Sequence, residues 1–124
     1  ERAWRRQADL LVKVVTPPAL TGSVAALLRE GGWRIDALPV HGCIFVGGEG
    51  NAADALRLDR TINETIDTHG PLGGRGFRVW YNRLADADLI APFAPPQSDY
   101  ALLCRIKSAM DPHNIFNPGR YLRG

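Results

Sequence analysis

The fold is decided by residues 9–48, which read DLLVKVVTPPALTGSVAALLREGGWRIDALPVHGCIFVGG. Residues 9–15 begin with Asp9 and are otherwise apolar and valine-rich apart from one lysine, which predicts a strand that is buried on both faces or nearly so. Two prolines stop this strand. Residues 21–30 carry valine and leucine at helical spacing and are followed by two glycines, which predicts a helix and its end.

Three more strands and one more helix complete the pattern. The strands are predicted at residues 33–38, 43–46 and 77–81. The second helix begins behind Asn51, a residue type that caps helices. Its apolar stripe consists of Ala55, Leu58, Ile62 and Ile66. The order β-α-β-β-α-β predicts a ferredoxin-like α+β fold, in which two helices cover one face of a mainly antiparallel four-stranded sheet.

The last third of the chain is not needed to complete that fold. Residues 82–97 contain three prolines and are typical of a crossing loop. Ser98 is expected to cap a helix over residues 99–110, which Asp111 and Pro112 end.

The chain is therefore predicted to divide into a ferredoxin-like domain at residues 1–97 and a C-terminal helix with an irregular tail at residues 98–124. The tail is too rich in Asn, Pro and Gly to be regular, yet it keeps Ile115, Phe116 and Tyr121. We expect these apolar side chains to dock against another surface.

Composition limits the classes of function. The 124 residues suit one domain, and 45% of them are hydrophobic, which is enough for a core. A net charge of +2 is too small to argue for nucleic acid or anionic lipid. The sequence has no apolar run long enough to span a membrane and no secretory signal. Because it starts at Glu1 and its one methionine is Met110, we expect a piece of a longer chain. The cysteine usage described next favours a cytoplasmic protein.

The cysteines and histidines do not predict a metal site. Cys43 and Cys104 lie far apart and are expected to be reduced, buried thiols, with a disulfide as the alternative. His41, His69 and His113 share no ligand spacing, so loop or surface positions are expected for them.

A glycine-rich stretch, THGPLGGRG at residues 68–76, resembles a phosphate-binding loop only in composition. It lacks the Lys-Ser/Thr pair of such loops and does not lead into a helix, so a long hairpin connection is favoured. Within it, Arg75 is hypothesised to face a substrate carboxylate or a partner domain.

Residues 75–81, RGFRVWY, also approach the RNA-recognition signature of a fold with the same topology. The match falls on the fourth predicted strand, and residues 10–15 offer no aromatic ring to stack on a base. Packing explains Phe77, Trp80 and Tyr81 better, and nucleic acid is not a predicted partner.

The most specific motif is DPHNIFNPGR at residues 111–120, directly behind an amphipathic helix that contains Lys107. It resembles the C-terminal end of FAD-linked oxidases of the vanillyl-alcohol oxidase/p-cresol methylhydroxylase superfamily. The Phe-Asn-Pro-Gly-Arg form is most similar to the small FAD-binding subunit of bacterial glycolate oxidase. The predicted β-α-β-β-α-β order is similar to that of the family's cap domain, so the resemblance extends loosely over the whole chain.

The resemblance implies that FAD and the substrate are bound mainly by different parts of the protein. A separate domain of the same longer chain binds most of the FAD, while the cap covers the flavin ring and shapes the substrate pocket, and the tail returns to the flavin domain. Asn117 is then the first candidate for a flavin contact and Arg120 the second, although either residue could instead be a structural latch. Pro118 fixes one backbone angle and Gly119 permits a close approach.

The implied reaction removes a hydride from a small 2-hydroxy acid such as glycolate, with the chemistry carried by FAD. The implied partners are a second flavoprotein subunit and an iron–sulfur subunit, through which the protein would lie peripheral to the inner face of the membrane. The related large subunit carries a histidine-flanked Gly-Asp-Gly-Asn run, whereas residues 47–51 here, GGEGN, have no flanking histidine. This departure argues against a metal site and against catalysis by this chain alone.

The alternative function is a stand-alone ferredoxin-like module that binds a small ligand or dimerises through its sheet. That alternative leaves the Phe-Asn-Pro-Gly-Arg tail unexplained.

Overall fold

The computed structural model describes residues 3–81, 83–84, 89–92 and 100–116. It divides the chain into two compact units, Glu1–Ala94 and Pro95–Gly124, which are described separately below. The predicted boundary between residues 97 and 98 lies outside the described residues.

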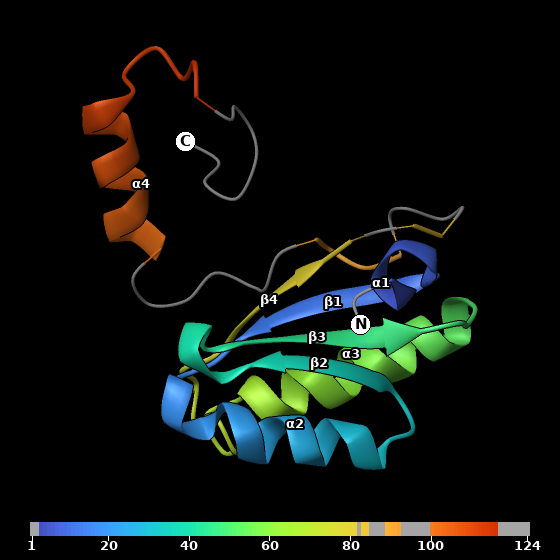
Figure 1. The fold of residues 1–124 in the computed structure, drawn as a ribbon. Coiled ribbons are helices and arrows are strands. Elements are labelled where there is room, and N and C mark those ends of the chain that lie inside the picture. The colour runs from blue at the N-terminus through green and yellow to red at the C-terminus, as the bar shows by residue number, and fades with distance from the viewer. Residues whose placement is uncertain (1–2, 82, 85–88, 93–99, 117–124) are drawn as a thin grey trace. The chain divides into compact units, whose positions relative to one another are not determined.

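The first unit is a four-stranded sheet with two long helices (Figure 1). Its main elements are β1 (Leu10–Val15), α2 (Thr21–Glu30), β2 (Arg34–Leu38), β3 (Cys43–Gly48), α3 (Ala52–Ile66) and β4 (Phe77–Trp80). The strand order is β2-β3-β1-β4, and each neighbouring pair is antiparallel. The predicted ferredoxin-like α+β fold is therefore confirmed.

Local sequence explains where the longer helix begins. The backbone N–H of Asp54 donates to Oδ1 of Asn51 at 3.1 Å, and the N–H of Asn51 donates to Oδ2 of Asp54 at 3.0 Å. This reciprocal capping box satisfies two N–H groups that the first turn of α3 would otherwise leave unpaired. The predicted cap at Asn51 is confirmed.

The core lies between the sheet and the helices α2 and α3, which lie below the sheet in Figure 1. Strand side chains alternate between the two faces of a sheet, so every second residue of a strand faces these helices. The fully buried strand residues on that face are Leu10, Val12, Val14, Ile44 and Val46. The predicted stripe of α3 is also buried, because Ala55, Leu58, Ile62 and Ile66 all belong to this core.

The glycine-rich stretch is a helix-to-strand connection that folds back on itself between α3 and β4, rather than a hairpin. Its Leu72 side chain is fully buried in the core. The backbone N–H groups of Leu72, Gly73, Gly74 and Arg75 all donate to carbonyls within residues 65–72. Gly73 and Gly74 have φ values of 55° and 75°, which favour glycine.

We predict that Leu72→Ala destabilises the protein by about 2–5 kcal/mol, because truncating a fully buried leucine leaves a cavity. The matched control is Leu56→Ala on α3, where the leucine is 46% exposed, and we expect a change within about 0.5 kcal/mol. Urea unfolding of both variants measures the difference. Equal losses in the two variants would contradict the assignment of Leu72 to the core.

The second unit contains α4 (Tyr100–Met110), which agrees with the helix predicted at residues 99–110 over all of its described residues. The proposed cap, Ser98, lies outside the described residues. Among the described residues, no helix is long and apolar enough to cross a membrane.

Candidate functional site

The residues predicted to form the site are described only in part. Asn117 and Arg120 lie outside the described residues, so their assignment to the flavin stays a prediction. Arg75 is exposed in the connection before β4, and its Nε donates to the carbonyl of Leu72 at 3.3 Å. The backbone N–H of Arg75 donates to the same carbonyl at 3.0 Å.

The open face of the sheet is defined here as the face opposite α2 and α3. The strand register places Phe45 of β3, Lys13 of β1 and Val79 of β4 side by side across its centre. All three side chains are half-buried, and Val15 of the same face is 36% exposed. The prediction that β1 is buried on both faces is therefore correct for the side that faces the helices. On the open face Leu11 is buried, Lys13 is half-buried and Val15 is exposed.

A short N-terminal helix, α1 (Trp4–Gln7), packs against β3 from this same side of the sheet (Figure 1). The Arg5 guanidinium lies over the Phe45 ring, 4.1 Å from its centroid, and pairs with the Asp36 carboxylate at 3.3 Å. Arg83 donates to the backbone carbonyls of Arg5 and Ala8 and so ties the end of α1 to the rest of the unit. Sequence analysis did not predict this helix.

Lys13 places a positive charge on the open face. Within the described part of the chain, its Nζ has no hydrogen-bond or ion-pair partner, whereas Arg5 is neutralised by Asp36. The neighbours of Lys13 across the strands, Phe45 and Val79, are apolar. A cation in such surroundings is suited to contact a small carboxylate.

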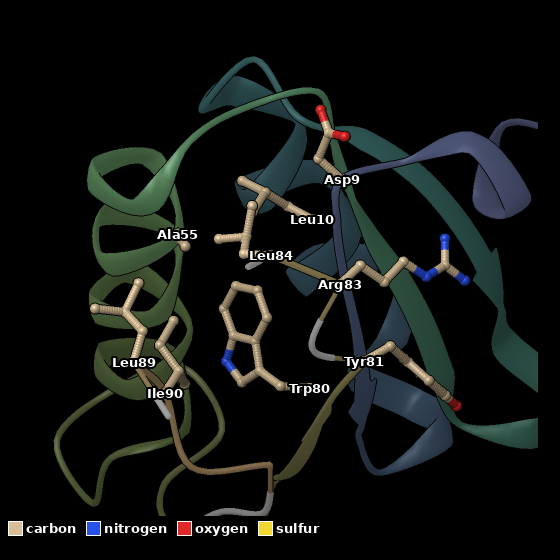
Figure 2. Close-up of a pocket in the computed structure, with 9 residues that line it drawn as sticks. All are labelled: Asp9, Leu10, Ala55, Trp80, Tyr81, Arg83, Leu84, Leu89 and Ile90. Atoms are coloured by element: carbon tan, nitrogen blue, oxygen red, sulfur yellow. The ribbon is translucent and has the colours of Figure 1, made fainter. Parts of the chain in front are cut away.

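Small recesses occur among the described residues of the first unit. One lies between β4 and α3, where the Trp80 ring points toward α3 while Tyr81 and Arg83 extend away from it (Figure 2). Its free space is about 10 Å³, close to the minimum for one water molecule, so it is a packing gap and not a ligand site. Another, about 80 Å³, is lined by Trp4, Arg34 and Glu49 beside α1.

A buried polar cluster joins β4 to α3 behind the sheet. The Arg78 side chain, 4% exposed, donates from Nε to Oδ1 of Asn63 at 2.9 Å and from Nη1 to the carbonyl of Ala91 at 2.9 Å. The same Nε lies 3.1 Å from Oδ1 of Asp59, which also accepts a hydrogen bond from Nε1 of Trp80 at 2.9 Å. Burial lowers the pKa of Arg78, and the Asp59 charge partly opposes that shift. All of these partners belong to the first unit, so the cluster holds β4 to α3 and has a structural role.

We predict that Arg78→Met lowers the free energy of unfolding by about 3 kcal/mol, because it removes one partner of a largely buried ion pair. The control is Arg60→Met, because Arg60 is exposed on α3, and we expect a change within about 0.5 kcal/mol. Chemical denaturation of the two variants gives the comparison. A loss for Arg78→Met no larger than that of the control would show that the cluster is not structural.

The second unit carries a compact set of interactions that we call the clasp: Lys107, Asp111 and Asn114. Asp111 is buried, with 9% of the residue exposed. Its carboxylate accepts hydrogen bonds from the backbone N–H groups of Ile115 at 2.8 Å and Phe116 at 3.0 Å. The Lys107 Nζ donates to Oδ2 of Asp111 at 2.9 Å and to Oδ1 of Asn114 at 2.8 Å. Asn114 has a φ of 51°, which reverses the chain direction.

The clasp holds Asp111 in its charged form. The hydrogen bond from Lys107 is the largest cause that lowers the pKa of Asp111. Burial raises this pKa by less than that hydrogen bond lowers it, and the two backbone N–H groups and the Lys107 charge lower it further. A carboxylate with a lowered pKa in the folded state stabilises that state above its ordinary pKa, and the contribution disappears as the pH falls through the lowered value.

We predict that the clasp is fully formed above pH 3.8, the ordinary pKa of Asp111, and opens at lower pH. The amide proton resonances of Ile115 and Phe116 should move together through this acid transition, because both donate to the titrating carboxylate. The Asp111→Asn variant should lack the transition. The same movement in that variant would exclude Asp111 as its cause.

The other sequence predictions concern metals and thiols. His41, His69 and His113 are all exposed, as expected for loop or surface histidines. Within residues 3–81, 83–84, 89–92 and 100–116, no three His, Cys, Asp or Glu side chains are grouped so as to hold a metal ion. Both cysteines are free, with Cys43 buried and Cys104 half-buried, so the prediction that both are buried is wrong for Cys104.

Comparison with protein-family models, with curated proteins and with solved structures gives no match. The resemblance of residues 111–120 to FAD-linked oxidases therefore rests on the motif itself.

The sequence alone does not predict the Arg78 cluster or the clasp. Asp111 was interpreted only as a helix breaker, yet Lys107 and Asp111 lie four residues apart, the spacing at which side chains on a helix meet. Asp59 and Asn63 have the same spacing beside the buried stripe of α3, but nothing in the sequence links them to Arg78.

Proposed function

We propose that this chain is the cap and tail of an FAD-dependent oxidoreductase that acts on a small, glycolate-like 2-hydroxy acid, and that the chain is not catalytic alone. The observation that carries this proposal is the second unit, which the ferredoxin-like sandwich does not need for its core. Ile115 and Phe116 are 69% and 70% exposed, and they directly precede the Asn-Pro-Gly-Arg motif. Large exposed apolar residues are a feature of surfaces that dock elsewhere.

The described residues do not fit the nucleotide part of FAD. A pyrophosphate is usually bound by free backbone N–H groups of a glycine-rich turn before a helix. Here the N–H groups of Leu72, Gly73, Gly74 and Arg75 are used within their own connection, which leads into a strand. We therefore assign FAD binding chiefly to a separate domain of a longer polypeptide, with Asn117 and Arg120 as the proposed contacts from this chain.

The proposed role of this chain's own residues is to shape the substrate side and exclude water. Val79 supplies apolar surface on the open face, where the Arg5 guanidinium covers the Phe45 ring, and Lys13 supplies a cation that suits the carboxylate of a 2-hydroxy acid. Arg75 is the second proposed carboxylate contact. FAD, when bound, supplies the hydride-accepting chemistry. The further proposed partners are a second flavoprotein subunit and an iron–sulfur subunit, in the cytoplasm at the inner face of the membrane.

The first test compares this 124-residue chain with the longer protein that contains it. We expect the longer protein to purify with FAD and to show flavin absorption, whereas the isolated chain should retain none. Stoichiometric FAD on the isolated chain, or a colourless longer protein that binds no added FAD, would contradict the proposal.

The second test concerns the carboxylate contacts in the longer protein. Lys13→Gln and Arg75→Ala should each raise KM for glycolate by about 10- to 100-fold, the loss expected for one charged hydrogen bond. Arg29→Gln is the control, because Arg29 is exposed on α2, away from the open face. Steady-state kinetics measures all three variants, and an unchanged KM removes the residue concerned from the proposed pocket.

One observation favours the alternative, a stand-alone ligand-binding or dimerising module. The sandwich has its own core, and the buried Arg78 cluster is satisfied within the first unit. Under that alternative the isolated chain would bind a small ligand or dimerise in the absence of any flavin domain, which analytical ultracentrifugation distinguishes.

A further inference from the structure

The strand β2 lies at one edge of the sheet. It pairs only with β3, and no described residue of the first unit forms a strand on its other side (Figure 1). At the opposite edge, the N–H of Trp80 in β4 donates to the carbonyl of Pro92 at 2.7 Å. An edge strand without such cover presents unpaired N–H and C=O groups, to which another strand can bond.

The register shows which backbone groups of β2 these are. Hydrogen-bonded and non-hydrogen-bonded positions alternate along an antiparallel pair. The N–H of Thr16 donates to the carbonyl of Gly42, so the even-numbered residues of β1 bond to the even-numbered residues of β3. The odd-numbered residues of β3 then bond to residues 34, 36 and 38 of β2. The N–H and C=O groups of Ile35 and Ala37 therefore point away from β3.

The side chains of β2 carry opposite charges on one face of the sheet. Arg34 and Asp36 lie two residues apart and share the open face with Phe45, which is the cross-strand partner of Asp36. Asp36 pairs with Arg5 at 3.3 Å. Arg34 is exposed and, in the part of the chain that the structure describes, has no hydrogen-bond or ion-pair partner. The strand therefore presents a guanidinium group next to a carboxylate, a charge pattern that is complementary to its own reverse.

We propose that two copies of this chain associate through β2, with the two strands antiparallel and a two-fold axis at Ile35. The outward N–H and C=O groups of Ile35 then bond to those of the same residue in the second copy. On each side of the axis, Arg34 of one copy lies opposite Asp36 of the other, at the closely spaced non-hydrogen-bonded position. Asp36 has two carboxylate oxygens, so it can accept from this guanidinium as well as from Arg5 of its own copy.

Charge selects this register and a second copy as the occupant. A two-fold axis at Asp36 would place two carboxylates opposite each other, and an axis at Arg34 would oppose two guanidinium groups; like charges in these positions are destabilising. An axis at residue 37 or 38 would place Pro39, which has no N–H, opposite an outward-pointing residue. Among the five positions of β2, only the axis at Ile35 pairs opposite charges and keeps the backbone bonds.

The inference goes beyond the proposed function and does not rest on it, because it uses only the backbone and the charges of β2. We expect the same pairing in the longer protein, with or without FAD. Dimerisation of the isolated chain through β2 is therefore compatible with the proposed function and with its alternative, and the FAD content of the longer protein separates those two.

The first experiment is sedimentation equilibrium of the 124-residue chain. A pair of five-residue strands is a small interface, so we expect a weak dimer with a Kd of about 0.1–1 mM. Arg34→Glu and Asp36→Arg should each raise this Kd at least tenfold, because each variant opposes like charges on both sides of the axis. An equimolar mixture of the two variants should restore association, since the mixed dimer again has opposite charges at both positions.

Two controls use Arg60→Glu, which makes the same change of charge at an exposed position on α3. Alone, this variant should dimerise like the wild type. Mixed with Asp36→Arg, it gives the same net charges as the first mixture but leaves one pair of guanidinium groups opposed. Association in this second mixture should therefore be weaker than in the first.

The second experiment needs no substitution and measures amide hydrogen exchange in the wild-type chain. The Ile35 amide points away from β3, so its exchange rate should fall as the chain associates. At a total chain concentration equal to Kd, half of the chains are paired, and this rate should be about half of its value in dilute solution. The Asp36 amide points toward β3 and should exchange at a rate that does not depend on concentration.

Each other outcome overturns the proposal in a defined way. A chain that stays monomeric across this concentration range does not pair through β2. A dimer that persists in Arg34→Glu uses a different surface, and equal recovery in the two mixtures excludes the register at Ile35. Protection of the Ile35 amide that is the same at every concentration shows that the chain itself covers this edge. A longer protein without FAD would contradict the proposed function and leave the pairing of β2 unaffected.

Discussion

The central position of β1 is the constraint on which the rest of the first unit depends. β1 pairs with β3 on one side and with β4 on the other, so a single alternation of side chains sets both faces of the sheet. Val12 and Val14 face the helices and are fully buried, which leaves Lys13 between them on the open face. A one-residue slip of β1 would exchange the lysine with the valines and place a charge in the core.

The two units use buried charge for different purposes. In the first unit, Arg78 and Asp59 connect a strand to a helix. In the second unit, Asp111 holds the backbone of residues whose side chains point into solvent. The first arrangement completes a core, whereas the second orders the backbone that follows α4.

Periodicity was sufficient to predict the sandwich, because the buried positions of β1 and α3 follow the strand and helix periods directly. It was insufficient for Arg78, since a charged residue in a strand is expected to face water and its partners come from a different element. It also missed α1, whose four residues are too few to show a pattern and which is held by tertiary contacts of Arg5 and Arg83. The motif at residues 111–120 predicted the end of the helix and irregular backbone after it, but not the hydrogen bonds of the clasp.

The unequal burial of the two thiols has a practical consequence. Cys43 lies inside the sheet at the start of β3, whereas Cys104 sits half-buried on α4. A maleimide-linked dye or nitroxide therefore reaches Cys104 before Cys43 and attaches to the helix that carries Lys107. The natural sequence thus already contains an attachment point for a spectroscopic reporter on the C-terminal unit.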